Sequence, residues 1–201
     1  MKKLLTVFLF LLLPLLGAQA APVAPMEVVK TTSERMLEAL RQNREALQKD
    51  PGKIYPLVEK IVLPHFDFET MSRWVLGKHW RSATPEQRTR FVAEFRNLLV
   101  RTYAKALLEY SDEEVRIPAQ PGPAADAKEA SVRTEIVPNS GKAIPIQYSM
   151  LLKDGDWKVF DVVIDGVSIV TNYRSSIAEQ VSKEGMEATI ARLSQRNSSG
   201  S

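Results

Sequence analysis

Apolar residues recur at helical spacing through the first half of the chain, after residue 20. The spacing predicts helices over 26–48, 53–63, Phe68–Leu76 and 85–110. Asp67 is suited to be the N-cap residue of the third helix, and Gly77 is suited to end it. Thr84 and Gln87 stand at the spacing of a capping box, so the fourth helix has a strong start signal.

After Tyr110 the apolar residues alternate with polar ones, which is typical of β-strands. The alternation predicts a short strand in "EVRIP" and longer strands at 129–138, 144–153 and 156–165. Helical spacing returns at about Ser168, with an interruption at Gly185. Helices, then antiparallel strands, then helix predict an α+β domain.

The pair Asp154-Gly155 predicts a two-residue hairpin turn between the last two strands. With regular pairing, this turn puts Tyr148 opposite Asp161. One sheet face is then almost entirely apolar, with the expected members Val132, Thr134, Ile136, Ile146, Tyr148, Met150, Leu152, Trp157, Val159, Asp161 and Val163.

The opposite sheet face also carries apolar residues, namely Phe160, Val162 and Ile164. Part of that face is therefore expected to be covered, and the N-terminal helix is the candidate. The helices supply more apolar surface than one short sheet requires. A cavity for an apolar ligand would explain the surplus, and so would an ordinary close-packed core.

Residues 1–20 have the pattern of an export signal. Two lysines precede an apolar run over 4–16, which is shorter than the roughly 20 residues of a membrane-spanning helix. The small residues of Ala18-Gln19-Ala20 predict cleavage after Ala20. The expected organisation is a signal peptide at 1–20, a single α+β domain at 21–195 and a disordered tail at 196–201.

Charge and cysteine content exclude several classes of protein. Two of the 27 Lys and Arg residues lie in the signal, which leaves 25 basic against 24 acidic residues, a net charge of +1. This balance gives no reason to expect nucleic-acid binding, which depends on phosphate neutralisation. The chain has no cysteine, so the fold is expected to be stabilised by its core without disulfides.

Two candidates for chemistry remain. The first is a group of possible metal ligands: His65, Asp67, Glu69 and His79. Their spacing lacks the compactness of a metal site, so no metal is expected. The second is Asp161, which could act as a general base on an apolar sheet face. It could equally be a structural group that is hydrogen-bonded to the Tyr148 hydroxyl or to a helix N-terminus.

Three segments together resemble the MlaC, or toluene-tolerance, family of periplasmic phospholipid-binding proteins. They are "FDFETMSRWVLGKHWRSATP" (66–85), "ATPEQRTRFVAEFRNLLVRTYAKAL" (83–107) and "WKVFDVVIDGVSIVTNYRSS" (157–176). The resemblance extends over about residues 28–195. It implies a curved antiparallel sheet packed against a helical layer, with an apolar lipid cavity between them.

The same resemblance implies a function. The chain is expected to be a periplasmic carrier of diacyl phospholipid, monomeric, with little head-group selection and without enzymatic activity or a cofactor. Its expected partners are an inner-membrane ABC transporter complex and an outer-membrane lipoprotein–porin complex, in a system that maintains outer-membrane lipid asymmetry. The alternatives are an enzyme of isomerase or dehydratase type with Asp161 as base, and a periplasmic protein-interaction or chaperone module.

The residues expected to contact lipid come from the apolar sheet face and the helices opposite it. They are Trp74, Val75, Leu99, Tyr103, Leu107, Val132, Ile136, Ile146, Tyr148, Met150, Val159, Val163, Val167, Ile169, Val170 and Tyr173. No catalytic residue is expected.

Overall fold

A computed structural model describes residues 22–109, 113–139 and 141–199, so the predicted signal at 1–20 lies outside the described residues. The helices are α1 (Pro25–Gln42), α2 (Arg44–Lys49), α3 (Ile54–Ile61), α4 (Phe68–Leu76), α5 (Lys78–Ser82), α6 (Pro85–Tyr103), α7 (Ala106–Glu109) and α8 (Ile169–Ser199), with 3-10 turns η1 (Pro51–Lys53) and η2 (Leu63–His65). The strands are β1 (Glu114–Arg116), β2 (Glu129–Val137), β3 (Ile144–Lys153), β4 (Asp156–Ile164) and β5 (Val167–Ser168).

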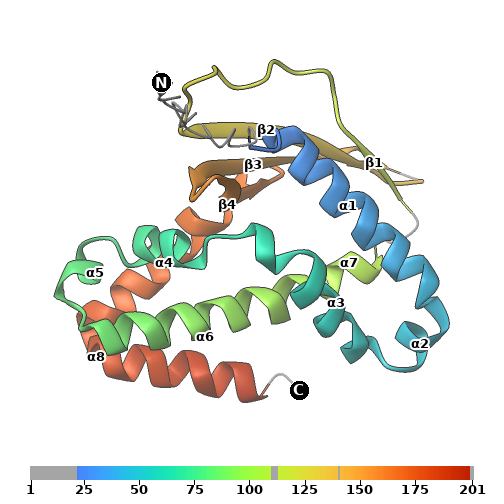
Figure 1. The fold of residues 1–201 in the computed structure, drawn as a ribbon. Helices are drawn as coiled ribbons and strands as arrows, with labels where there is room; N and C mark the ends of the chain where they lie inside the picture. The colour runs from blue at the N-terminus through green and yellow to red at the C-terminus, as the bar shows by residue number, and fades with distance from the viewer. Residues whose placement is uncertain (1–21, 110–112, 140, 200–201) are drawn as a thin grey trace, which may run out of the picture.

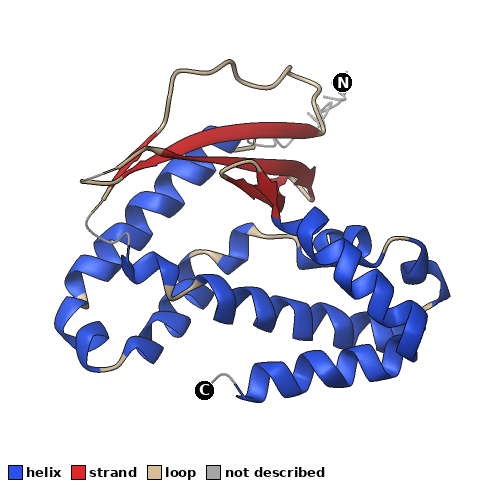
Figure 2. Cartoon of the chain, turned by 180° about the vertical axis from the view of Figure 1, so that it is seen from behind, coloured by secondary structure: helices blue, strands red, loops and turns tan. Residues whose placement is uncertain are grey.

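The strands form one open antiparallel sheet in the order β1-β2-β3-β4-β5. Figure 1 shows this sheet above a layer of helices that includes α4, α6 and α8, with α1 running from the sheet down to α2. Figure 2 shows the same two layers from behind. The predicted α+β architecture is confirmed. Among the described residues, no helix combines the length and the apolar character needed to cross a membrane.

The predicted helix caps are present. The Asp67 carboxylate accepts a hydrogen bond from the Thr70 backbone N–H at 3.0 Å and starts α4. The Thr84 hydroxyl accepts from the Gln87 N–H at 3.2 Å, and the Gln87 side chain accepts from the Thr84 N–H at 3.0 Å. This reciprocal pair satisfies two backbone donors that the first turn of α6 would otherwise leave unpaired.

Three predictions about helices need correction. The helix predicted over 85–110 ends at Tyr103, and the short helix α7 begins at Ala106. The helix predicted over 26–48 divides at Asn43 into α1 and α2. The predicted tail at 196–201 is helical as far as Ser199, because α8 continues past a break at Gly185. Asn197 fixes this last turn to α6, since its side-chain amide donates to the Glu94 carbonyl oxygen at 3.0 Å.

The β3–β4 hairpin turns at Asp154 and Gly155, both of which have positive φ, as the predicted turn requires. Pairing follows the predicted register from Lys153–Asp156 through Met150–Val159 and then shifts. Ser149 pairs with Asp161, so Phe160 is an extra residue and forms a β-bulge. The ring of Phe160 stacks on Trp74 of α4, with 6.1 Å between the ring centroids.

The bulge exchanges the two faces of β4 beyond Phe160. Tyr148 lies opposite Val162, not opposite Asp161 as predicted. Because a shift of one residue reverses every side chain of a strand, Val162 joins the inner face and Val163 joins the outer face. The predicted hydrogen bond between Tyr148 and Asp161 is therefore wrong.

Asp161 instead connects the sheet to the start of α8. One carboxylate oxygen accepts from the Ser168 hydroxyl at 2.6 Å, and the other accepts from the Val170 backbone N–H at 3.1 Å. A carboxylate is stabilising at a helix N-terminus, where backbone donors are unpaired. The structural alternative of a helix N-terminus is thus the one that the geometry supports.

Asp67 makes a second connection, between the helical layer and the sheet. Its backbone N–H donates to the Val159 carbonyl oxygen at 2.8 Å, and its carboxylate accepts from the Lys153 ammonium at 3.0 Å. Burial favours the neutral acid and raises the pKa of Asp67. Hydrogen bonds from Thr70 and Lys153 outweigh that effect and hold the pKa below its ordinary value.

Substitution Asp67→Asn is expected to lower the free energy of unfolding by about 2 kcal/mol at neutral pH, because it removes charge-assisted hydrogen bonds to a buried group. Since the native pKa is below the unfolded one, this stabilisation is complete above the ordinary carboxyl pKa and is lost as pH falls through the native value. Urea unfolding of both proteins at neutral and acid pH measures the difference.

The matched control is Glu69→Gln. Glu69 also approaches Lys153, at 3.8 Å, but its side chain is 53% exposed, so a change below about 0.5 kcal/mol is expected. A gap between wild type and Asp67→Asn that stayed constant down to acid pH would contradict the pKa argument.

For Asp161, replacement by alanine is expected to cost about 1–2 kcal/mol of stability, the usual cost of losing a side-chain acceptor at a helix start. Asparagine keeps one acceptor oxygen for the Val170 N–H and should cost less than half as much. Urea unfolding of the two variants compares these losses, and an alanine variant as stable as wild type would disprove the connecting role.

Candidate lipid-binding cavity

A cavity of about 170 Å³ lies between α1, the η2–α4 connection and the inner face of the sheet. Helix α1 lines one wall with Val29, Met36 and Leu40 among others. The sheet lines the opposite wall, with residues that include Ile146 and Val159. The N-terminal helix therefore covers the inner face of the sheet, and the prediction that it covers the outer face is wrong.

The cavity lies where two separate hydrophobic clusters adjoin. The first cluster joins the sheet to α4, α6 and α8, and Val29 of α1 belongs to it. The second joins the C-terminal half of α1 to α2, α3 and the end of α6, and Met36 and Leu40 belong to it. The cavity is lined by members of both clusters, so it occupies an incompletely filled boundary between two packed regions.

The polar groups at this cavity carry no charge at neutral pH. Burial, together with the nearby Lys158 and Arg35, lowers the pKa of His65, so its imidazole is neutral. Burial raises the pKa of the Tyr148 phenol, and the neighbouring Thr134 hydroxyl offsets part of that rise. The space therefore suits an apolar ligand and would be unfavourable for an ion.

Two hydroxyl groups give the cavity a small polar element. The oxygen of Thr32 on α1 is buried and forms no hydrogen bond within the described part of the chain, whereas the buried Thr134 hydroxyl on β2 neighbours the Tyr148 hydroxyl. A buried hydroxyl without a partner costs roughly 1–3 kcal/mol. A ligand with a hydrogen-bonding atom at this depth would remove that cost.

A wider groove continues from the cavity toward the surface, between α1 and β1. Cavity and groove share Ser33, Leu37 and Val115. The groove is bordered by Glu27, Lys30 and Glu34 of α1 and, on the other side, by residues 117–120. An apolar ligand in the cavity could thus extend a polar end to solvent along this path.

Five of the residues predicted to bind lipid line this cavity: Leu107, Ile136, Ile146, Tyr148 and Val159. Six others belong to the packed cluster of the sheet and helices: Val75, Leu99, Val132, Met150, Ile169 and Val170. Tyr103 and Tyr173 pack against that cluster, and Tyr173 meets Phe95 edge to face with 5.5 Å between centroids.

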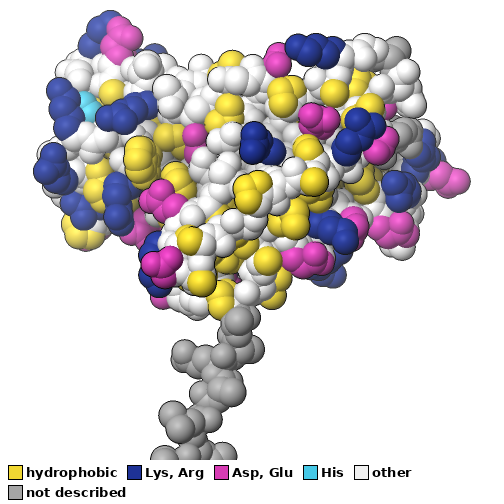
Figure 3. All heavy atoms as spheres, turned by 90° about the horizontal axis from the view of Figure 1, so that it is seen from above, with side chains coloured by type: hydrophobic (Ala, Val, Ile, Leu, Met, Phe, Trp, Pro, Cys, Tyr) yellow, Lys and Arg dark blue, Asp and Glu magenta, His cyan; other side chains and the backbone are white. Residues whose placement is uncertain are grey.

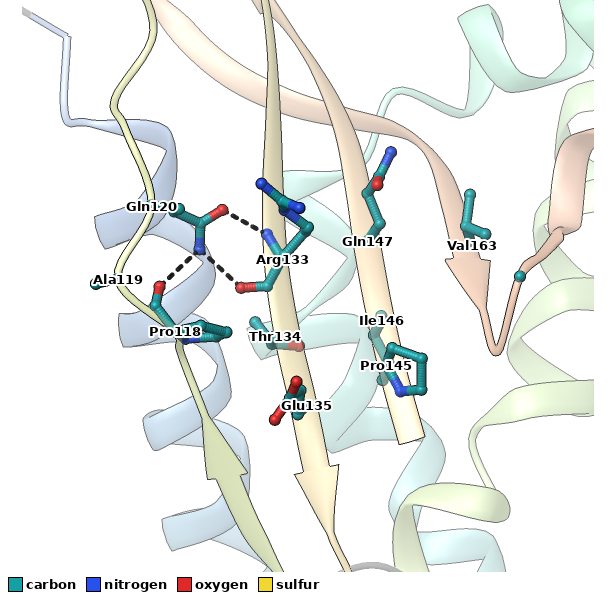
Figure 4. Close-up of a pocket in the computed structure, with 11 residues that line it drawn as sticks. Pro118, Ala119, Gln120, Arg133, Thr134, Glu135, Pro145, Ile146, Gln147 and Val163 are labelled. Carbon is teal, nitrogen blue, oxygen red and sulfur yellow. Dashed lines mark hydrogen bonds between the residues drawn. The ribbon is translucent and has the colours of Figure 1, made fainter. Parts of the chain in front are cut away.

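The remaining three predicted residues lie elsewhere. Trp74 and Val167 are exposed at the surface, with 51% and 58% of their area accessible. Val163 borders a hollow on the outer face of the sheet, which Figure 4 shows beside Gln147 and Pro145.

That outer hollow is closed on one side by the Pro-rich segment after β1. The Gln120 side-chain amide donates to the Arg133 carbonyl oxygen and accepts from the Arg133 N–H, both at 2.8 Å, as the dashed lines of Figure 4 show. The side chain thereby replaces a strand residue at the edge of β2, which would otherwise leave these backbone groups unpaired.

Sequence reasoning missed the contribution of α1, which supplies Val28, Val29, Thr32, Ser33, Met36, Leu37 and Leu40. The apolar stripe of this helix was visible, but a stripe does not reveal which sheet face it meets. The suspected metal ligands also separate, since no three of the described His, Asp and Glu residues are placed to share an ion.

Comparison with known proteins agrees with the geometry. Residues 30–195 match the model of the MlaC protein family. Toluene tolerance protein Ttg2D of Pseudomonas putida is 33% identical over 173 residues, which cover 86% of this chain and 79% of that protein. The intermembrane phospholipid transport system binding protein MlaC of Haemophilus influenzae is 26% identical over 200 residues, 97% of this chain and 93% of that one.

A solved structure also matches. The phospholipid-binding protein from Ralstonia solanacearum, in complex with a phospholipid, superposes with a TM-score of 0.80 at 27% identity, and the match covers 89% of this chain and 99% of that chain. The resemblance noted in the sequence is thereby confirmed: this chain belongs to the MlaC family.

Proposed function

We propose that this protein is a phospholipid carrier that holds acyl chains in the cavity between α1 and the inner face of the sheet. The observation that carries the proposal is an uncharged, largely apolar cavity that opens into a surface groove. The phospholipid complex of the Ralstonia solanacearum relative supports it. The head group is expected in the groove, outside the apolar wall.

The cavity must widen to take a phospholipid. Its volume of about 170 Å³ is below the roughly 300–1,000 Å³ of pockets that hold drug-sized ligands. Helix α1 is the element best placed to move, because it crosses from one hydrophobic cluster to the other and forms one wall by itself. Displacement of α1 from β2 would enlarge the space and withdraw Val29 from the first cluster, while the contacts among α4, α6 and α8 stay in place.

Release of the lipid then requires a partner. Burying two acyl chains of about 30 methylenes in total gives a gross gain of ~25 kcal/mol, so spontaneous loss to water is unfavourable. A partner that stabilises the widened state would lower the barrier to transfer. We propose an inner-membrane ABC transporter complex and an outer-membrane lipoprotein–porin complex for this role, with export to the periplasm after cleavage at Ala20.

An enzymatic function is not supported by the position of Asp161. Its carboxylate lies on the outer side of β4 and both oxygens accept hydrogen bonds at the start of α8. We therefore propose a carrier without catalytic activity.

If the protein is a carrier, the purified protein should retain about one or more phospholipids per chain. Organic extraction and native mass spectrometry detect this retained lipid. Substitution Ile136→Trp places a large ring in the cavity and should reduce the retained lipid at least about fivefold, since the free volume is small. Lipid content per folded chain is the measured quantity.

The control is Val163→Trp, which places the same large ring on the outer face of the same sheet. It should leave lipid content unchanged. Equal lipid content in all three proteins would exclude this cavity as the binding site, and its absence even from gently purified wild type would favour a protein-interaction or chaperone module.

A further inference from the structure

A cluster of basic and aromatic side chains lies at the end of the molecule formed by α4 and α5, away from α1 and β1. We call it the basic–aromatic patch. Its members are Arg73, Trp74, Lys78, Trp80, Arg81, Arg88 and Arg174. Figure 3 shows several Lys and Arg side chains at the left end of the molecule, where Figure 1 places α4 and α5, and others toward the right end.

The local charge contrasts with that of the whole chain. Residues 71–90 contain five basic residues, namely Arg73, Lys78, Arg81, Arg88 and Arg90, and one acidic residue, Glu86. The chain beyond residue 20 has 25 basic and 24 acidic residues. The excess of positive charge is therefore concentrated in this segment.

Contacts between the helices hold several members of the patch together. The guanidinium carbons of Arg73 on α4 and Arg88 on α6 lie 5.8 and 5.4 Å from the centroid of the Trp80 ring on α5. Such cation–π contacts hold the guanidinium groups in place. Arg174 of α8 joins them at Gly77, where a Cβ atom would come within 3.3 Å of its guanidinium.

Two of the charges are available for a partner. Lys78 and Arg81 are exposed, and neither forms an ion pair within the described ranges. The charge of Arg73 is partly neutralised by Glu69, at 3.3 Å. Arg90 is not counted in the patch, because its charge is paired with Glu187 at 2.8 Å.

The exposed Trp74 indicates what kind of partner fits. Its indole is 51% accessible, although it stacks on Phe160. Tryptophan flanked by Lys and Arg is typical of surfaces that lie at the membrane–water interface, where the ring enters the head-group region and the cations attract anionic lipids. An acidic protein surface would use the cations but would not need the exposed indole.

We infer that the basic–aromatic patch binds the surface of an anionic phospholipid membrane. The basic side chains attract the anionic head groups over a short range, and the Trp74 indole then inserts at the membrane–water interface. This inference does not depend on lipid in the cavity, because the patch and the cavity are lined by different residues.

The test measures binding to sedimentable vesicles of phosphatidylcholine alone and of phosphatidylcholine with phosphatidylglycerol, at physiological salt. Wild type should bind the anionic vesicles and release at high salt. The double substitution Lys78→Glu with Arg81→Glu should weaken the partition at least about tenfold, since each basic residue near an anionic surface contributes roughly fivefold. Trp74→Ala should weaken it several-fold while thermal unfolding stays cooperative.

The matched control is Lys49→Glu with Lys53→Glu, which makes the same change in net charge on exposed residues of α2 and η1. This variant should bind nearly as well as wild type. Equal losses in the two charge variants, or no wild-type binding to anionic vesicles, would overturn the inference.

The absence of native cysteine allows a second readout. An environment-sensitive fluorophore on Ser82→Cys, beside the patch, should shift to the blue on anionic vesicles, whereas the same probe on Gln48→Cys of α2 should not. Binding to polyglutamate beads that equals vesicle binding and ignores Trp74→Ala would instead assign the patch to an acidic protein partner.

Discussion

The sheet has an apolar inner face that the helical layer covers only in part, and the cavity follows from that mismatch. The sheet is held to the helices along β4 and at the end of β3, through Asp67 at the start of α4 and Asp161 at the start of α8. No comparable polar connection is found between α1 and β2 within the described residues. The wall formed by α1 is therefore held mainly by apolar contact, which is non-directional and tolerates displacement.

Local chemistry made several elements predictable. The cap at Asp67, the capping box of Thr84 and Gln87, and the turn at Asp154-Gly155 each satisfy backbone groups within a few residues, so the sequence contains the whole determinant. The bulge at Phe160 was not predictable in this way. The bulged residue stacks on Trp74, more than eighty positions away, and the alternation of apolar and polar residues along β4 contains no signal for such a contact.

An apolar cavity beside the sheet was predicted, but only some of the residues that line it were predicted. Ile136, Ile146 and Val159 lie on three strands and share one face of the sheet, which the alternation of apolar and polar residues reveals, and the structure places all three at the cavity. Periodicity cannot distinguish a residue at an unfilled boundary from one in a packed core, which is why Val75 and Met150 were grouped with them. The contribution of α1 depends on which sheet face the helix meets, and that is decided by the whole fold.

The groove and the basic–aromatic patch lie at different ends of the molecule, which suggests that they have different roles. Figure 1 places α1 and β1 at one end of the molecule and α5 at the other, so a membrane bound at the patch would leave the groove uncovered. Helix α4 connects the cavity to the patch. It begins just after Phe66, which lines the cavity, and its second half contains Trp74 of the patch. With nine residues, α4 is about 13 Å long. Membrane contact would then hold the carrier near the bilayer, while lipid leaves or enters through a groove that remains open to a protein partner.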